Sequence, residues 1–170
     1  HWYRQHNEGI LDDRGQWSRK GRVDVDLLER CCADNYFSLP APKSTGPEYF
    51  NLGWLTPLLG GHESPADVQA TLRALTSRTI SGAVSQHLPG TEQIYLCGGG
   101  VKNDALIEEL RMDFDGLTVD STAAVGMDPQ WVEACAFAWL AHQRLTQQPG
   151  NIPAVTGAVR PAVLGALYHP

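Results

Sequence analysis

A short apolar segment followed by three glycines and a helix constrains this fold more than any other sequence feature. Residues 93–97 (Gln-Ile-Tyr-Leu-Cys) are rich in strand-forming side chains and lie between turn residues, which predicts a buried strand. Gly98, Gly99 and Gly100 follow. Residues 103–114 then carry leucine and phenylalanine side chains four positions apart, which predicts a helix. A strand, a glycine turn and a helix in succession indicate a layered α/β domain.

The rest of the chain continues this alternation. Ser64 and Pro65 have the residue types preferred at the N-cap and first position of a helix, so a long amphipathic helix is predicted to begin there and end before Pro89. Other predicted elements are a helix that ends before Gly9, a helix over residues 23–35, a loop over 36–50, a strand over 117–119, a helix that Asp128 and Pro129 open and that ends near 147, and an edge strand over 163–168. The expected fold is α/β, with a mixed sheet flanked by helices.

The amino-acid composition is that of one ordinary globular domain, and it excludes some classes of binding partner. Hydrophobic residues make up 42% and charged residues 19% of the 170 residues, which is enough for a real core. The formal net charge of -6 argues against nucleic acid as a partner, because nucleic-acid-binding proteins usually carry a basic patch. No apolar run approaches the roughly 20 residues that span a bilayer, and no signal peptide is recognised, so no membrane association is expected.

The four cysteines indicate a reducing compartment. They form no CxxC pair, and no histidine stands at ligand spacing near them, so no zinc site is expected and no metal ligand is assigned. Cys31 and Cys32 are adjacent, which disfavours a disulfide between them. Reduced thiols predict a cytoplasmic protein.

The glycine triplet allows two interpretations. Glycines at a strand-to-helix junction let the backbone approach a ligand closely, and the following helix offers free N–H groups and the positive end of its dipole. The pattern is neither a P-loop nor a dinucleotide-binding fingerprint. From these residues alone, a tight structural turn and a nucleotide contact are equally good explanations.

Longer sequence motifs around the triplet resemble those of a known family. Residues 98–103 (GGGVKN) resemble the adenosine motif of the sugar-kinase, actin and heat-shock ATPase superfamily. Three further segments resemble words of the anhydro-N-acetylmuramic acid kinases, in the family's order: 42–50 (PKSTGPEYF), 133–141 (EACAFAWLA) and 150–158 (GNIPAVTGA). Residues 14–18 and Gly21 also fit the family's preceding segment. The resemblance therefore covers most of the chain.

The resemblance implies one lobe of an actin-like, ribonuclease H-like ATPase fold. It also implies an enzyme that uses ATP and water to open the ring of 1,6-anhydro-N-acetylmuramic acid and to phosphorylate O6, yielding N-acetylmuramic acid 6-phosphate in peptidoglycan recycling. Mg²⁺ is the expected metal cofactor, and a homodimer is the expected assembly of the intact enzyme. Phosphoryl transfer of this kind also needs a base to activate the water.

Two sequence motifs of the family have no counterpart in these 170 residues. They are the SGTSxDG phosphate loop and the DTGPGN word, whose aspartate is taken to be the general base. We therefore expect the chain to be the C-terminal nucleotide-binding lobe, with the N-terminal lobe absent, and to have no kinase activity alone.

Glu133 is the residue of this chain most directly implicated in chemistry. The helix that carries it is apolar over much of its surface and is predicted to be well buried, and a buried carboxylate is costly unless it is paired. The resemblance implies that Glu133 faces the cleft and binds the sugar. The alternative is a first-turn acid that complements the helix dipole.

Two groups of residues are candidate nucleotide ligands. Gly98, Gly99, Gly100 and Asn103 would hold the adenosine, although the sequence slightly favours Asn103 as a helix N-cap. Lys43, Ser44, Thr45 and Gly46 offer donors to phosphate, or else form a structural loop between prolines. Lys102 is expected to be solvated, and Asn151, Thr156 and Gly157 are expected to rim the cleft by resemblance alone.

Two other functions are compatible with parts of the sequence. One is a different kinase of the same superfamily, acting on acetate or a hexose, against which the PKSTG and EAxAFAWLA words argue. The other is a nucleotide-binding module without catalysis. Phosphorylation of the anhydro sugar separates both alternatives from the leading prediction.

Overall fold

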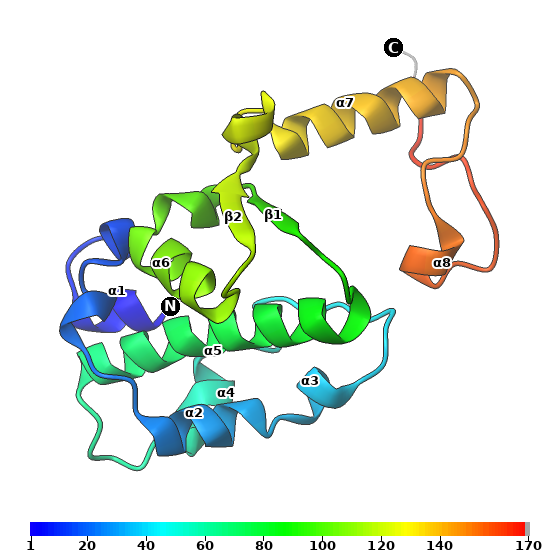
Figure 1. Ribbon diagram of the computed structural model, residues 1–170. Helices are drawn as coiled ribbons and strands as arrows, with labels where there is room; N and C mark the ends of the chain where they lie inside the picture. The colour runs from blue at the N-terminus through cyan, green and yellow to red at the C-terminus, as the bar shows by residue number, and fades with distance from the viewer. Residues whose placement is uncertain (169–170) are drawn as a thin grey trace.

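The computed structural model describes residues 1–168 and shows helices around a small parallel sheet (Figure 1). β1 (Gln93–Leu96) pairs with β2 (Thr118–Ser121) in parallel, with Ile94 opposite Val119. α6 (Asp104–Asp113) connects the two strands, as a parallel pair requires. The α/β class is confirmed. The mixed sheet is wrong for the described residues, which form only this parallel pair.

α5 (Pro65–His87) runs along the middle of the molecule, with α2 (Val25–Cys32) packed against it (Figure 1). The Ser64 hydroxyl accepts a hydrogen bond from the Asp67 N–H, so the predicted cap is confirmed. The larger hydrophobic core lies between these helices and includes Leu27, Leu28, Cys31, Leu55, Val68, Ala74 and Leu75. Burial of the thiol raises the pKa of Cys31 to about 11, so this cysteine stays protonated as part of the core.

A second, smaller core joins α6 to the sheet. It consists of Leu110, Phe114 and Val119. Arg73 of α5 donates to Glu109 of α6 at 2.5 Å and to the buried Ser18 hydroxyl at 3.0 Å, so the two helices are also held by a largely buried ion pair. These contacts fix α6, and with it the end of the glycine turn, on the main body of the protein.

α7 (Val132–Leu145) extends away from this body, and α8 (Pro153–Thr156) lies below its far end in the view of Figure 1. The prediction that α7 is well buried is wrong, because none of its residues is buried. Phe137 is 65% exposed and Trp139 is 52% exposed. Few groups of residues 1–168 pack on α7, chiefly Leu164 and Leu167 of the tail, so its apolar side chains stay in water.

The segment after α7 folds back through backbone and side-chain hydrogen bonds. The Gly150 N–H donates to the Ala162 carbonyl at 3.0 Å, and the Asn151 side chain accepts from the Ala162 N–H at 2.7 Å. The edge strand predicted over 163–168 is wrong, because that segment has no strand partner in the described chain.

The remaining elements are short. They are α1 (Trp2–His6), α3 (Asn35–Ser38), α4 (Leu52–Leu55) and the 3-10 turns η1 (Asp13–Gly15), η2 (Ser18–Lys20), η3 (Thr56–Leu58), η4 (Gly99–Lys102) and η5 (Thr122–Val125). Within residues 1–168, no helix is both long and apolar enough to cross a membrane.

Candidate functional site

The glycine turn follows β1 directly and has an open backbone. Gly98 has φ 76° and ψ -168°, a conformation that favours glycine over any residue with a Cβ. Gly99 then begins η4. A Cβ built on any of the three glycines would meet no atom within 4 Å, so the side of the turn where side chains would stand is free for a ligand.

Residues 128–131 hold the glycine turn from the other side. The Gly98 N–H donates to the Pro129 carbonyl at 2.8 Å, and the Gln130 side-chain amide donates to the Gly98 carbonyl at 2.9 Å. Asp128 was expected to cap α7, and this is wrong, since the helix begins at Val132. Asp128 instead accepts from the Gln130 N–H and closes a turn whose polar groups face Gly98.

Asn103 caps α6, so the capping alternative is confirmed. Its side-chain oxygen accepts from the Leu106 N–H at 3.1 Å. Gly15, with φ 72°, lies so close to Asn103 and Ala105 that a Cβ there would clash with both. The segment resembling the family's RGQWS word is thus packed against the start of α6, where Arg14 also pairs with Asp104.

A cavity of about 380 Å³ adjoins the turn at the carboxyl ends of the two strands. Leu96, Val101 and Ile107 form its apolar part. The rest of the lining is polar or charged and consists of Asp104, Glu108, Arg111, Asp120 and Ser121. Ligands of open α/β sheets bind at this end of the strands. The volume lies in the range of about 300 to 1,000 Å³ that is usual for small-molecule sites.

The Lys43–Gly46 loop lies on the far side of α3 and has a local role in this structure. The Lys43 ammonium donates to the Tyr36 and Phe37 carbonyls at 2.9 and 3.0 Å and stands 4.9 Å from the Tyr36 ring centre. It therefore caps the end of α3, a structural contact that the sequence did not predict for the lysine. Ser44 and Thr45 are exposed.

Two of the family-like words meet in space although more than a hundred residues separate them. Gly157, which ends α8 in the left-handed conformation, approaches the Pro42 ring so closely that a Cβ would lie 2.9 Å from it. The 150–158 segment therefore contacts the 42–50 segment. The glycine turn contacts Pro129 and Gln130, which immediately precede α7 and the 133–141 segment.

Glu133 lies in the first turn of α7 and is exposed. Its position fits a first-turn acid that complements the helix dipole. The argument from burial fails, because the helix is not buried. The side chain is open to solvent.

The structure also shows an aromatic cavity that the sequence did not predict. It has a volume of about 450 Å³, and its lining includes Trp2, Phe37, Phe50, Trp54, Leu72 and Thr45. Asp34 fixes one wall by accepting from Trp54 Nε1 at 2.8 Å and Tyr49 Oη at 2.9 Å. The only sequence signal was the aromatic pairs at either end of the proline-rich loop.

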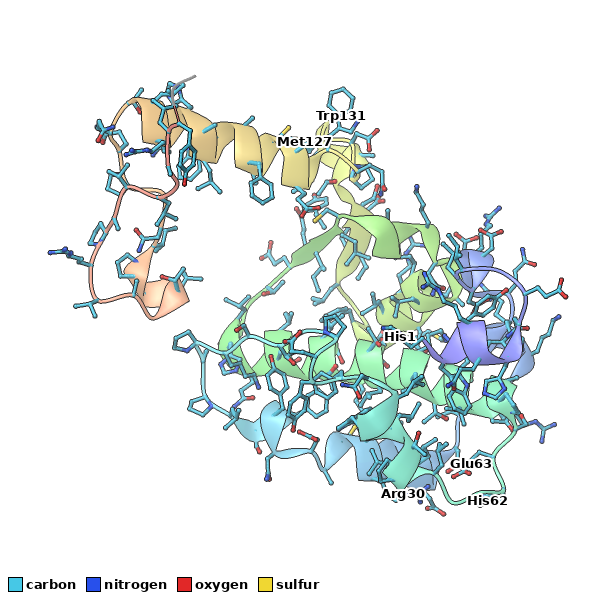
Figure 2. The ribbon with its side chains drawn as sticks, turned by 180° about the vertical axis from the view of Figure 1, so that it is seen from behind. His1, Arg30, His62, Glu63, Met127 and Trp131 are labelled. Carbon is cyan, nitrogen blue, oxygen red and sulfur yellow. The ribbon has the colours of Figure 1, made fainter. Side chains whose placement is uncertain are left out.

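Asp24, His62 and Glu63 form a polar cluster that their sequence spacing did not indicate, with ligand-type atoms within 4.8 Å of one another. Figure 2 shows His62, Glu63 and Arg30 together, across the molecule from Trp131 and Met127. Glu63 accepts from the Gly60 N–H at 2.7 Å and from Arg30 at 3.2 Å, while Asp24 caps α2. These protein partners make the cluster an anchor for the loop before α5.

Comparison with known proteins identifies the family. The family model described as "Anhydro-N-acetylmuramic acid kinase" matches residues 1–170. The chain belongs to the anhydro-N-acetylmuramic acid kinase family. It is 48% identical to the kinase of Nitrosomonas europaea over 167 residues, 46% identical to that of Coxiella burnetii over 158, and 45% identical to that of Xanthomonas campestris pv. campestris over 168.

These matches confirm the resemblance and define its extent. They cover 92% to 98% of this chain but only 42% to 46% of the relatives, so the chain spans a little under half the length of the anhydro-N-acetylmuramic acid kinases it matches. Membership in a kinase family agrees with the turn and cavity at the carboxyl end of β1. The alternatives of an acetate or hexose kinase are not supported.

Proposed function

We propose that this chain is the nucleotide-binding part of an enzyme that uses ATP and water to convert 1,6-anhydro-N-acetylmuramic acid to N-acetylmuramic acid 6-phosphate. The observation that carries the proposal is the open glycine turn at the end of β1, in a chain of this family. The reaction would place the protein in peptidoglycan recycling, in the cytoplasm.

The residues at the turn fit a nucleoside better than a phosphate chain. The apolar wall of the adjoining cavity suits a base, and Asp120 and Ser121 can accept from or donate to hydroxyl groups. Three carboxylates, those of Asp104, Glu108 and Asp120, outnumber the single cation Arg111 in its lining and disfavour phosphates there, so the phosphates would extend from the open side of the glycines. Mg²⁺ would enter with those phosphates, since it is usually held by substrate phosphates and one or two carboxylates.

The exposed apolar surface of α7 supports a lobe in a larger enzyme. An apolar helix in a soluble protein is normally covered, and large exposed patches mark interaction surfaces. We infer that α7 is covered by the second lobe of an actin-like kinase, which the relatives' greater length accommodates. A homodimer of the intact enzyme belongs to the same proposal.

The roles of individual residues follow from this placement. Gly98–Gly100 would contact the adenosine, while Asn103 sets the direction of α6. Glu133 would reach the sugar from the start of α7. Because the Lys43 ammonium already binds two carbonyls, the Ser44 and Thr45 hydroxyls are the better phosphate donors of the Lys43–Gly46 loop.

The test is phosphorylation of 1,6-anhydro-N-acetylmuramic acid by the intact gene product that contains these residues, with ATP and Mg²⁺ and with the product identified by mass spectrometry and ³¹P NMR. Gly98→Ala should raise the KM for ATP. Gly90→Ala is the matched control, because Gly90 also has a positive φ and an open Cβ position. Each variant should lose about 1 to 3 kcal/mol through backbone strain, yet only Gly98→Ala should affect ATP. Absence of the sugar 6-phosphate would overturn the proposal.

A further inference from the structure

The backbone N–H and the backbone carbonyl of Gly98 are both hydrogen-bonded by two consecutive residues. Pro129 accepts from its N–H and the Gln130 side chain donates to its carbonyl. The same carbonyl also accepts from the Val101 N–H at 3.4 Å, which closes the first turn of η4. One side-chain amide therefore acts on the residue that sets the direction of the whole glycine turn.

Three successive glycines do not fix their own geometry. Glycine populates positive and negative φ about equally, so a triplet needs external contacts to hold one arrangement of its N–H groups. In the described chain these contacts come from the turn at 128–131, which is itself closed by Asp128 accepting from the Gln130 N–H at 2.8 Å and from Trp131. The Gln130 backbone is thus fixed, and its side chain bridges to Gly98.

The same turn leads directly into the helix that carries Glu133. The Cys135 N–H donates to the Trp131 carbonyl at 2.8 Å, so helical bonding begins from the last residue of the turn. Any displacement of Gly98 relative to this turn changes the position of the glycines relative to the first turn of α7. Gln130 is the only side chain of residues 1–168 that hydrogen-bonds across this junction to Gly98.

We propose that Gln130 is a positioning residue that orients the glycine turn for nucleotide and couples it to the start of α7. This inference rests on the proposed function. Gln130 is exposed, so loss of its hydrogen bond costs little folding stability, and its effect belongs to nucleotide binding.

The chain offers a matched control for this role. Gln143 is also a glutamine whose side-chain amide donates to a backbone carbonyl, that of Pro149, at 3.1 Å, and it lies in the last turn of α7. It lies at the other end of the helix, away from the glycines. Variants at Gln130 and Gln143 therefore remove the same chemical contact in two places.

The experiment measures the KM for ATP, the kcat and the thermal midpoint of the intact gene product, together with the Kd for ATP by calorimetry. A net hydrogen bond of about 0.5–1.5 kcal/mol corresponds to a rise of about 2- to 12-fold in the KM and Kd for Gln130→Ala. Gln130→Glu keeps the shape but replaces the donor with a carboxylate that faces a carbonyl oxygen, so its rise should be larger. The kcat and the thermal midpoint should stay close to wild type, and Gln143→Ala and Gln143→Glu should leave all four quantities unchanged.

Three outcomes would overturn the inference. They are an active wild type whose KM and Kd do not change in the Gln130 variants, equal changes in the Gln143 variants, and a lowered thermal midpoint with unchanged nucleotide affinity. A wild type without turnover would refute the proposed function, and the Kd comparison would then still decide the role of Gln130. A wild type that binds no ATP overturns both.

Discussion

Two regions of this chain carry apolar helical side chains in very different environments. α2 and α5 bury Leu27 and Val68 almost completely, at 0% and 1% exposure. α7 has a higher proportion of apolar side chains, yet it buries none of them. The hydrophobic effect stabilises a helix only where another surface removes its side chains from water. The difference shows that the first region holds a core of its own, whereas α7 leaves its apolar side chains exposed.

The largest expected effect tests this difference in stability. Leu27→Ala should lower the free energy of unfolding by about 2–5 kcal/mol, because it opens a cavity in a filled core. Phe137→Ala in the same chain should change it by less than about 0.5 kcal/mol, since the ring already contacts water. Urea unfolding followed by circular dichroism measures both. Equal losses would mean that α7 is packed in solution and that the comparison is wrong.

A second pair of variants tests what holds α6 in the first region. Glu109→Gln weakens the bond to Arg73, where both side chains are about 15% exposed, and should cost about 2 kcal/mol. Glu108→Gln weakens an exposed pair with Arg19 and should cost much less, because solvent screens that pair. The same unfolding assay applies. If the neighbouring substitutions cost the same, the buried pair has no special role in attaching α6.

Acid should weaken the first region. Burial raises the pKa of Asp34, but hydrogen bonds from the Tyr36 N–H, Trp54 and Tyr49 outweigh it and hold the pKa below its usual value. The Gly60 N–H similarly lowers the pKa of Glu63, and the Arg22 N–H that of Asp67. A lowered folded-state pKa gives stability that is present above the unfolded value, near 4, and lost as the pH falls through the folded value. Urea midpoints should therefore fall below about pH 4, and Asp34→Asn should flatten that fall; an unchanged profile would contradict the role of these bonds.

The smallest global effect is expected from an asparagine in the second region. Asn151→Ala removes the side-chain bonds to the Ala162 N–H and the Arg160 carbonyl, so amide exchange at Ala162 should accelerate while the urea midpoint stays unchanged. Asn103→Ala removes a cap from α6 and should cost about 1 kcal/mol globally. A global loss from Asn151→Ala would place the tail in the same cooperative unit as the core.

Local signals in the sequence predicted most elements of the fold. The Ser64–Pro65 start, the strand before Gly98 and the Asn103 cap each depend on neighbouring residues, and each is confirmed. The prediction for the start of α7 was wrong, because Pro129 and Gln130 bind Gly98, about thirty residues away in the sequence. A local sequence pattern cannot show such a contact. The burial of α7 failed for a related reason, since apolar periodicity reports a preference for a partner and not its presence.

For the same reason, the sequence predicted some residues of the candidate site but not the contacts between them. Its glycines were found from their place between a strand and a helix. The contact of Gly157 with Pro42 and the role of Gln130 depend on tertiary folding, so no spacing rule indicates them. Lys43 had the right chemistry for phosphate, but the nearby carbonyls at the end of α3 bind its ammonium.

The most direct test of the account is an ATP titration of the ¹⁵N-labelled chain in the presence of Mg²⁺, followed by amide NMR. We expect the largest shifts at Gly98, Gly99 and Gly100, with smaller shifts at Gln130 and at residues lining the adjoining cavity, such as Val101 and Ser121. Shifts confined to the aromatic cavity around Trp54, or no shifts at the glycines at saturating ATP, would contradict the assignment of the glycine turn as the nucleotide site.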